Sequence, residues 1–127
     1  MKLVGRVVCG KGEGRKFLTL KQYSEGFEKI LGEKPFAGTL NLDVGDKHIE
    51  RMQKLQKKAP LMVDGFVDEE KQYYEVKCMP ARIAEQNGLI IFAKLTHHPP
   101  NIVEFVCAKK MRTQLGLNDG DLIEIEI

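Results

Sequence analysis

A short segment near the N-terminus, residues 10–17 (GKGEGRKF), places three glycines at alternate positions among Lys11, Arg15 and Lys16. Glycine lets the backbone adopt positive φ and approach a ligand closely, so that successive N–H groups bind phosphate oxygens. The spacing is neither that of the P-loop nor that of the dinucleotide fingerprint. The segment therefore indicates either a phosphate-binding loop or the tip of a hairpin.

A second candidate site lies in residues 34–42 (KPFAGTLNL). The alternation of apolar and polar residues over 38–44 predicts a strand that carries Thr39 and Asn41 on one face. A hydroxyl and an amide oxygen are hard neutral ligands, which suit a magnesium ion whose charge is balanced by substrate phosphates. The alternative is a solvated strand face.

Residues 96–104 (THHPPNIVE) form a third candidate. His97 and His98 are neighbours, and neighbours on an extended chain point to opposite faces, so the pair does not predict a zinc site. The two prolines that follow predict a stiff loop. Glu104 interrupts the apolar strand 102–106, so its carboxylate either faces solvent or is held there for a purpose.

The remaining chemical candidates are a basic segment and three cysteines. Lys109, Lys110 and Arg112 begin a predicted short helix, where cations and backbone N–H groups bind an anion together, unless they form only a solvated basic face. Cys9, Cys78 and Cys107 lie far apart and are odd in number, which argues against a disulfide framework. Each is predicted to be a small buried thiol.

Short strands dominate the elements that must position these groups. We expect strands over 2–9, 17–20, 38–44, 61–67, 72–78, 79–83, 89–94, 102–107 and 122–127. Turns are expected at 68–71 and at the Asn87-Gly88 pair. A helix is predicted over 21–31, and residues 47–58 suit either a short amphipathic helix or a polar loop. This order indicates a mainly antiparallel sheet closed as a barrel.

Length and charge bound the class of protein. A chain of 127 residues with 43% hydrophobic and 30% charged residues predicts one domain over 1–127 with its own core. A net charge of +2 does not by itself imply a polyanionic partner. No apolar run approaches the roughly 18 residues of a membrane span, and charge interrupts the N-terminus, so we expect a soluble cytoplasmic protein without a membrane partner.

The order of these motifs resembles the archaeal CTP-dependent riboflavin kinase family over essentially the whole chain. The matching segments are GKGEGRKF, then KPFAGTLNL, then the Thr-His-His loop ending in Glu104, then AKKMR with LGLNDGD and a closing LIEIEI strand. The resemblance implies a small six-stranded cradle-loop β-barrel that transfers the γ-phosphate of CTP to the 5′-hydroxyl of riboflavin, giving FMN and CDP. The chain departs from the usual family pattern at Phe36 and Ala37, and at Cys107 and Ala108.

The resemblance also assigns roles to residues. The CTP phosphates are expected at a loop made of Gly10, Lys11, Gly12, Glu13, Gly14 and Arg15. The cytidine is expected at Lys109, Lys110, Met111 and Arg112, partly through backbone groups. Thr39 and Asn41 are expected to hold Mg²⁺. Thr96 and Glu104 are expected to contact the flavin, with Glu104 orienting the ribityl hydroxyl and accepting its proton. Phosphoryl transfer needs mainly alignment and charge neutralisation, so the absence of a nucleophile motif is no obstacle.

Two other classes of function fit a small barrel with basic loops. One is a module that binds nucleic acid or a protein partner. Modules that bind single-stranded nucleic acid need aromatic side chains on which the bases stack. Aromatic residues make up only 7% of this chain, with no Trp, so we expect no nucleic-acid partner. The other is a different kinase or a flavin-binding protein on the same barrel, which need not keep Thr39 together with Asn41. The chain is expected to act as a monomer.

Overall fold

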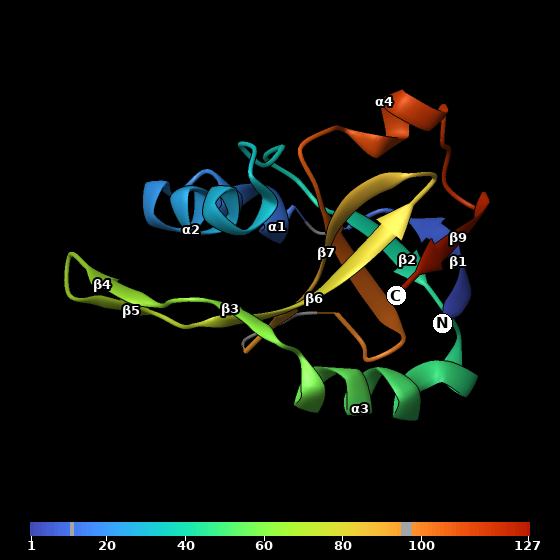
Figure 1. Cartoon of the computed structure of the whole chain (residues 1–127), viewed down its shortest axis with the longest axis horizontal. Helices are drawn as coiled ribbons and strands as arrows, with labels where there is room; N and C mark the ends of the chain where they lie inside the picture. The colour runs from blue at the N-terminus through green and yellow to red at the C-terminus, as the bar shows by residue number, and fades with distance from the viewer. Residues whose placement is uncertain (11, 95–97) are drawn as a thin grey trace.

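The computed structural model describes residues 1–10, 12–94 and 98–127. This part of the chain is mainly β with a few short helices (Figure 1). Its strands are β1 (Lys2–Val8), β2 (Leu40–Asp43), β3 (Leu61–Val63), β4 (Phe66–Asp68), β5 (Lys71–Tyr73), β6 (Val76–Ile83), β7 (Gln86–Ala93), β8 (Ile102–Val106) and β9 (Leu122–Glu126). Its helices are α1 (Glu13–Leu18), α2 (Lys21–Leu31), the 3-10 turn η1 (Asp46–His48), α3 (Ile49–Lys58) and α4 (Met111–Leu115).

Six of the strands close into an antiparallel barrel. Their order is β6-β7-β8-β2-β1-β9, and β9 returns to β6 where Glu126 pairs with Arg82. An ion pair between these two side chains, 2.9 Å long, lies at the closing position. β3 adds to one end of β6, and β4 and β5 form a separate two-stranded arm that extends away from the barrel (Figure 1). The barrel predicted from the sequence is confirmed.

Apolar side chains at alternate strand positions fill the barrel. β1 places Leu3 and Val7 inside, and β2 places Leu40 and Leu42 inside. α3 and α4 lie at opposite sides of the barrel and contribute Met52 and Met111 to the same core (Figure 1). Every second residue of these strands therefore faces the barrel interior, as strand geometry requires.

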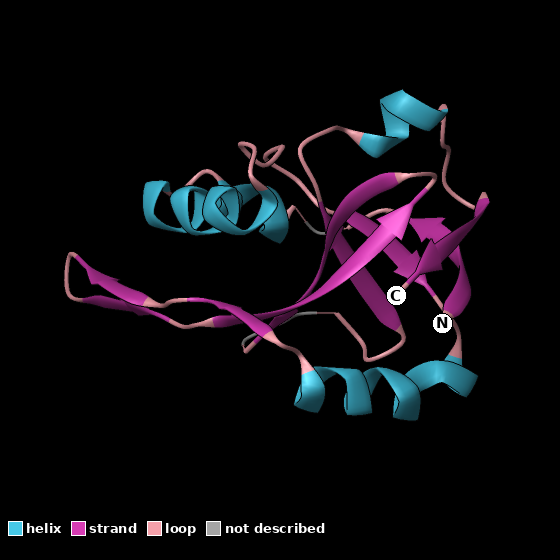
Figure 2. Cartoon of the chain, in the orientation of Figure 1, coloured by secondary structure: helices cyan, strands magenta, loops and turns pink. Residues whose placement is uncertain are grey.

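A second apolar core covers the outer face of β6, β7 and β8. The helix α2 lies beside β3 and β7 on this side of the sheet (Figure 2). This core is formed by strand residues that point away from the barrel interior and by side chains of α1, α2 and β3. Its central buried members are Leu18, Tyr23, Phe27, Val63 and Val106. Because both faces of this part of the sheet are covered, polar residues there lie in a sheltered position between the barrel and α1.

The strand predicted over 17–20 is wrong, because α1 continues to Leu18. Gly14 and Leu18 are four residues apart and are both buried, which is the spacing of one helical face. Gly12 precedes the helix with φ of 78°, a conformation that glycine adopts without strain. The buried position at residue 14 carries no side chain, so the apolar periodicity that reveals a helix is missing from the sequence.

The turn predicted at Asn87-Gly88 is also wrong. Ala84 and Glu85, both with positive φ, make the two-residue turn, and β7 begins directly after it. A Cβ atom on Gly88 would overlap the Phe105 ring and lie 2.5 Å from the Val106 carbonyl oxygen. The glycine therefore allows close packing of β7 on β8 rather than a turn.

Several other predictions are confirmed. The helix over 21–31 is α2 with the same bounds, and the left-handed Gly32 ends it. Residues 47–58 are helical, in η1 and α3. The hairpin across 68–71 is present in the arm, where Asp68 pairs with Lys71.

No helix within the described ranges is long and apolar enough to cross a membrane.

The cysteines divide into two kinds. Cys78 and Cys107 are buried free thiols, as predicted, whereas Cys9 is exposed at the end of β1, where the prediction of burial fails. Burial raises the pKa of the Cys78 thiol to about 12 and raises that of Cys107 as well. These two thiols are therefore protonated and poor nucleophiles near neutral pH.

Candidate functional site

Asn41 and Glu104 lie opposite one another in the ladder between β2 and β8. Their strand neighbours Leu40, Leu42, Val103 and Phe105 point into the barrel core, so Asn41 and Glu104 point to its outer face. Directly opposed residues of an antiparallel pair lie on the same face with close Cβ atoms. The register thus brings together a predicted metal ligand and the predicted catalytic carboxylate, which are far apart in sequence.

Thr39 completes a polar group beside Asn41. The Thr39 hydroxyl donates a hydrogen bond of 3.2 Å to Asn41 Oδ1. Asn41 is 6% exposed, although its side chain is polar. Since a buried polar group is costly unless it has partners, the pair forms a fixed arrangement of two oxygen atoms on the outer face of the barrel.

Two glycines let the N-terminal segment approach these oxygens. A Cβ atom on Gly10 would overlap the Asn41 amide nitrogen. A Cβ atom on Gly14 would lie 2.6 Å from Thr39 Cγ2 and 2.8 Å from Thr39 Oγ1. Any larger residue at position 10 or 14 would therefore displace the Thr39–Asn41 pair. Of the two alternatives for this segment, the hairpin tip is wrong, because Gly12 leads directly into α1 and Gly10 lies against Asn41 of β2.

The pair fits a magnesium ion by its chemistry. A threonine hydroxyl and an asparagine amide oxygen are oxygen donors of the kind that Mg²⁺ accepts, and both are neutral. Within residues 1–10, 12–94 and 98–127, no group of three or more His, Cys, Asp or Glu side chains is arranged to hold a metal ion. Thr39 and Asn41 therefore suit an ion that arrives with phosphate oxygens, and not an ion bound by protein carboxylates alone.

A glycine-rich cleft of about 460 Å³ opens beside this pair. Its charged lining residues among those described are Arg15, Lys110 and Arg112, all cations. The described lining residues are Gly10, Gly12, Gly14, Arg15, Phe36, Ala37, Gly38, Thr39, Asn41, His98, Lys110 and Arg112. Glycine backbone and cations from two ends of the chain thus meet around one hollow, which suits an anionic ligand.

A second cleft, also of about 460 Å³, lies on the other side of α1. Four aromatic residues line it: Phe17 and Tyr23 come from the helices, and Tyr73 and Tyr74 come from the arm and the residue that follows it. The charged residues Lys16, Lys71, Glu75 and Lys94 line it as well. The Tyr23 hydroxyl donates a hydrogen bond of 2.6 Å to the Tyr74 carbonyl oxygen, which ties the arm to α2. Burial in this cluster raises the pKa of Tyr23. This aromatic cleft suits a flat, largely apolar ligand.

The two clefts adjoin at Gly14 and His98, which line both. Glu104 lines the aromatic cleft, while its cross-strand neighbour Asn41 lines the glycine-rich cleft. His98 Nε2 lies 3.6 Å from Glu104 Oε1, and each of these side chains is 11% exposed. A ligand in one cleft therefore meets a ligand in the other at the Asn41–Glu104 pair.

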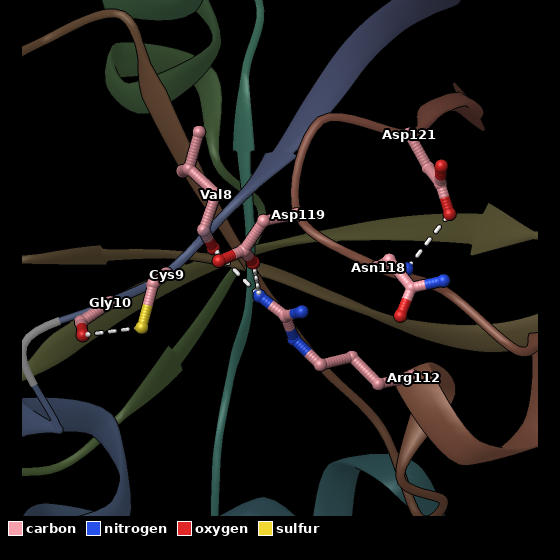
Figure 3. Close-up of polar contacts among 7 residues, drawn as sticks. All are labelled: Val8, Cys9, Gly10, Arg112, Asn118, Asp119 and Asp121. Carbon is pink, nitrogen blue, oxygen red and sulfur yellow. Dashed lines mark hydrogen bonds and ion pairs between the residues drawn. The ribbon is translucent and has the colours of Figure 1, made fainter.

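The residues of the basic segment before and within α4 differ in exposure and in their contacts. Lys109 and Lys110 are exposed, whereas the Met111 side chain is buried in the barrel core and offers a ligand only its backbone. The Arg112 guanidinium donates to the Val8 carbonyl oxygen at 3.2 Å and pairs with Asp119 (Figure 3). Arg112 thus joins α4 to the end of β1, just before Gly10. The Cys107 carbonyl accepts a hydrogen bond from the Phe36 N–H, which fixes the opposite rim.

The structure brings together most of the residues that the sequence singles out. Lys11 and Thr96 lie outside the described residues, and Glu13 begins α1. The sequence analysis missed the aromatic cleft and the position of His98 between the clefts. The sequence places Tyr23 only within the helix predicted over 21–31. The adjacent pair Tyr73-Tyr74 is a signal for the cleft, because neighbouring strand residues cannot both face one core.

The fold and the clefts define a class: a small closed β-barrel with a cationic, glycine-lined cleft and an aromatic cleft that meet on its outer face. Comparison with known proteins gives the family. The family model named CTP-dep_RFKase, described as "Domain of unknown function DUF120", matches residues 7–127. The chain belongs to this family, that of the archaeal CTP-dependent riboflavin kinases.

Individual relatives agree with this assignment. A riboflavin kinase of Methanococcus aeolicus is 39% identical over 130 residues, which cover 99% of this chain and 98% of the relative. Riboflavin kinases of Archaeoglobus fulgidus and Pyrobaculum calidifontis are each 36% identical over the whole chain. The chain spans 54% of the former relative and 60% of the latter.

Proposed function

We propose that this protein is a riboflavin kinase that transfers the γ-phosphoryl group of CTP to the 5′-hydroxyl of riboflavin, giving FMN and CDP. The observation that carries the proposal is the pairing of Asn41 with Glu104 where the two clefts adjoin. It places a candidate metal ligand on the phosphate side and a carboxylate on the acceptor side, next to each other. Membership of the family and the names of the relatives support the same activity.

CTP occupies the glycine-rich cleft in this proposal. Backbone N–H groups of Gly10, Gly12, Glu13 and Gly14 bind phosphate oxygens, and Lys11 and Arg15 add positive charge. The cations Lys110 and Arg112 supply charge from the other rim. Lys109, Lys110, Met111 and Arg112 contact the cytidine, in part through main-chain groups, which read a base edge without depending on side-chain rotamers. Discrimination of CTP from ATP rests on this segment.

Riboflavin occupies the aromatic cleft. The volume of about 460 Å³ lies within the range of small-molecule pockets, roughly 300–1,000 Å³. The isoalloxazine ring packs against Tyr23, Tyr73 and Tyr74, because flat aromatic surfaces stack favourably. The ribityl chain then points to Glu104 at the junction of the clefts, with Thr96 as a further flavin contact.

Thr39 and Asn41 would hold Mg²⁺. When bound, this ion neutralises phosphate charge and favours departure of CDP. Glu104 orients the 5′-hydroxyl and accepts its proton as that oxygen bonds to the γ-phosphorus. The bond from the γ-phosphorus to the bridging oxygen breaks, and CDP leaves with that electron pair. Transfer is direct and in line, so no protein nucleophile is needed.

The proposal takes the chain as a monomer, because both substrates bind within one chain. It also takes a reducing, cytoplasmic setting, which suits three cysteines that are all free.

The test is an incubation of the protein with riboflavin, Mg²⁺ and either CTP or ATP, with FMN separated and quantified. We expect FMN with CTP, much less with ATP, and none when Mg²⁺ is chelated. Tight RNA binding with no FMN from any nucleotide would overturn the proposal and favour a nucleic-acid module on the same barrel.

A further inference from the structure

His98 occupies a position that the proposed mechanism does not use. It lines both clefts, and its Nε2 atom lies 3.6 Å from Glu104 Oε1. Both side chains are 11% exposed, so neither is a solvated surface group. A carboxylate removed from water is costly unless polar groups surround it, and His98 is one such group.

The segment that carries His98 is held firmly to β2. The Ile102 N–H donates to the Pro99 carbonyl at 3.0 Å, and the Val44 N–H donates to the Asn101 carbonyl at 2.9 Å. The Asn101 amide also donates to the Asp43 carboxylate at 2.9 Å. Pro99 and Pro100 restrict the backbone between these anchors and His98. The imidazole is therefore presented from a turn that is fixed to the strand carrying Asn41.

The distance between His98 and Glu104 and the orientation of the Glu104 carboxylate both bear on its role as a proton acceptor. A separation of 3.6 Å is too long for a hydrogen bond, but catalytic contacts in ligand-free proteins are often long and tighten when substrate binds. In the proposed complex Glu104 would lie between the phosphates of one ligand and the hydroxyl of the other, so a carboxylate that turned away from the hydroxyl would not accept its proton. The His98 side chain at its Oε1 atom limits this rotation.

We propose that His98 is a positioning residue for phosphoryl transfer, which holds the Glu104 carboxylate toward the ribityl hydroxyl at the junction of the two clefts. This inference rests on the proposed function and adds to it a residue that acts through Glu104. The structure assigns no such role to His48, which is half-buried in η1 at the start of α3. His48→Ala is therefore the matched control.

The experiment is a double-mutant cycle on kcat, with the wild type, His98→Ala, Glu104→Gln and the double variant. A loss of position predicts that His98→Ala lowers kcat by about 30-fold while both KM values change by less than about threefold. In the Glu104→Gln background the same substitution should change kcat by less than about threefold, because residues that act as a unit are not additive. The inference would be overturned if the kcat loss of the double variant equalled the product of the two single losses. It would also be overturned if His98→Ala left kcat unchanged.

A second variant separates position from folding. His98→Gln keeps an N–H donor near the place of Nε2, so it should recover most of the kcat that alanine loses; a loss as large as that of alanine contradicts the role. Riboflavin binding, followed by flavin fluorescence, should be unchanged in both variants and in His48→Ala. If the wild type makes no FMN, the proposed function fails; if it makes FMN and His98→Ala is as fast, only this inference fails.

Discussion

Gly10 lies so close to Asn41 that a Cβ atom on Gly10 would overlap the Asn41 amide nitrogen. In the same way, a Cβ atom on Gly14 would lie 2.6 Å from Thr39 Cγ2. Each glycine of the N-terminal segment therefore packs against one of the two proposed metal ligands, Gly10 against Asn41 and Gly14 against Thr39. This fit links the loop that is proposed to bind phosphates to the pair that is proposed to hold the metal ion.

Gly10→Ala and Gly14→Ala should each damage activity more than stability. The added methyl group displaces Asn41 or Thr39, and misplaced ligands cost about 100-fold in kcat, while overpacking costs about 1–3 kcal/mol of unfolding free energy. Gly26→Ala is the matched control, because its Cβ would lie 2.6 Å from Val63 Cγ1 in the outer core, away from both clefts. Urea denaturation should show a similar loss of unfolding free energy for all three variants. FMN formation should show that only Gly26→Ala keeps the wild-type kcat. An unchanged kcat in Gly10→Ala would contradict the fit.

Asn41→Ala should abolish magnesium-dependent activity. The variant loses an amide oxygen that is held by the Thr39 hydroxyl at 3.2 Å, and no group of three or more acidic, histidine or cysteine side chains in the described ranges replaces it. The measurement is kcat against Mg²⁺ concentration, with the exposed Asn118→Ala as control. Full activity of Asn41→Ala at the wild-type Mg²⁺ concentration would show that the ion is held elsewhere.

Lys110→Ala should affect only CTP binding, whereas Arg112→Ala should also affect stability. Lys110 is exposed at the rim, so its loss should raise the KM for CTP by about fivefold, as for one partly screened charge, without changing stability. Arg112 bonds to the Val8 carbonyl and to Asp119, so Arg112→Ala should also lower the unfolding free energy by about 1–2 kcal/mol. Asp119→Ala removes the ion pair and leaves the cleft cations in place. Equal stability of the Lys110 and Arg112 variants would contradict the structural role of Arg112.

Asp43→Asn tests the anchor beneath the His98 segment through pH. The hydrogen bond from the Asn101 side chain, with that from the Gly45 N–H, lowers the pKa of Asp43. A folded-state pKa below the unfolded value gives stability that is present above the unfolded pKa and is lost as pH falls through the folded pKa. The variant should be about 1 kcal/mol less stable at neutral pH, and the difference should shrink as pH falls through the lowered folded-state pKa of Asp43. Urea denaturation at several pH values measures this difference in unfolding free energy. A difference that stays constant with pH would show that the Asp43 carboxylate does not anchor the segment through Asn101.

Local patterns in the sequence predict much of the barrel but not the relationships within the site. Alternation reveals β2, and the spacing of Tyr23 and Phe27 with Gly32 behind them reveals α2. α1 escapes because Gly14 gives no apolar signal at a buried helical position. The Asn87-Gly88 pair misleads because a glycine serves packing against Phe105 as well as it serves a turn.

The site itself depends on register and on long-range packing. Asn41 and Glu104 are each recognisable as unusual strand residues, yet only the pairing of β2 with β8 makes them neighbours. The aromatic cleft combines Phe17 and Tyr23 with Tyr73 and Tyr74, which lie about fifty residues further along the chain. No local pattern reports such a contact. The resemblance to a family supplied candidate residues, and the geometry supplied His98.

The most direct test of the account follows the phosphorus atom. CTP carrying radioactive phosphorus at the γ position is incubated with riboflavin, Mg²⁺ and the protein, and the products are separated. The account predicts that the label moves to FMN in a one-to-one ratio with CDP formed, with no labelled protein and no rapid release of inorganic phosphate. Label that stays in CTP, appears on the protein or is released as inorganic phosphate while riboflavin is unchanged would contradict it.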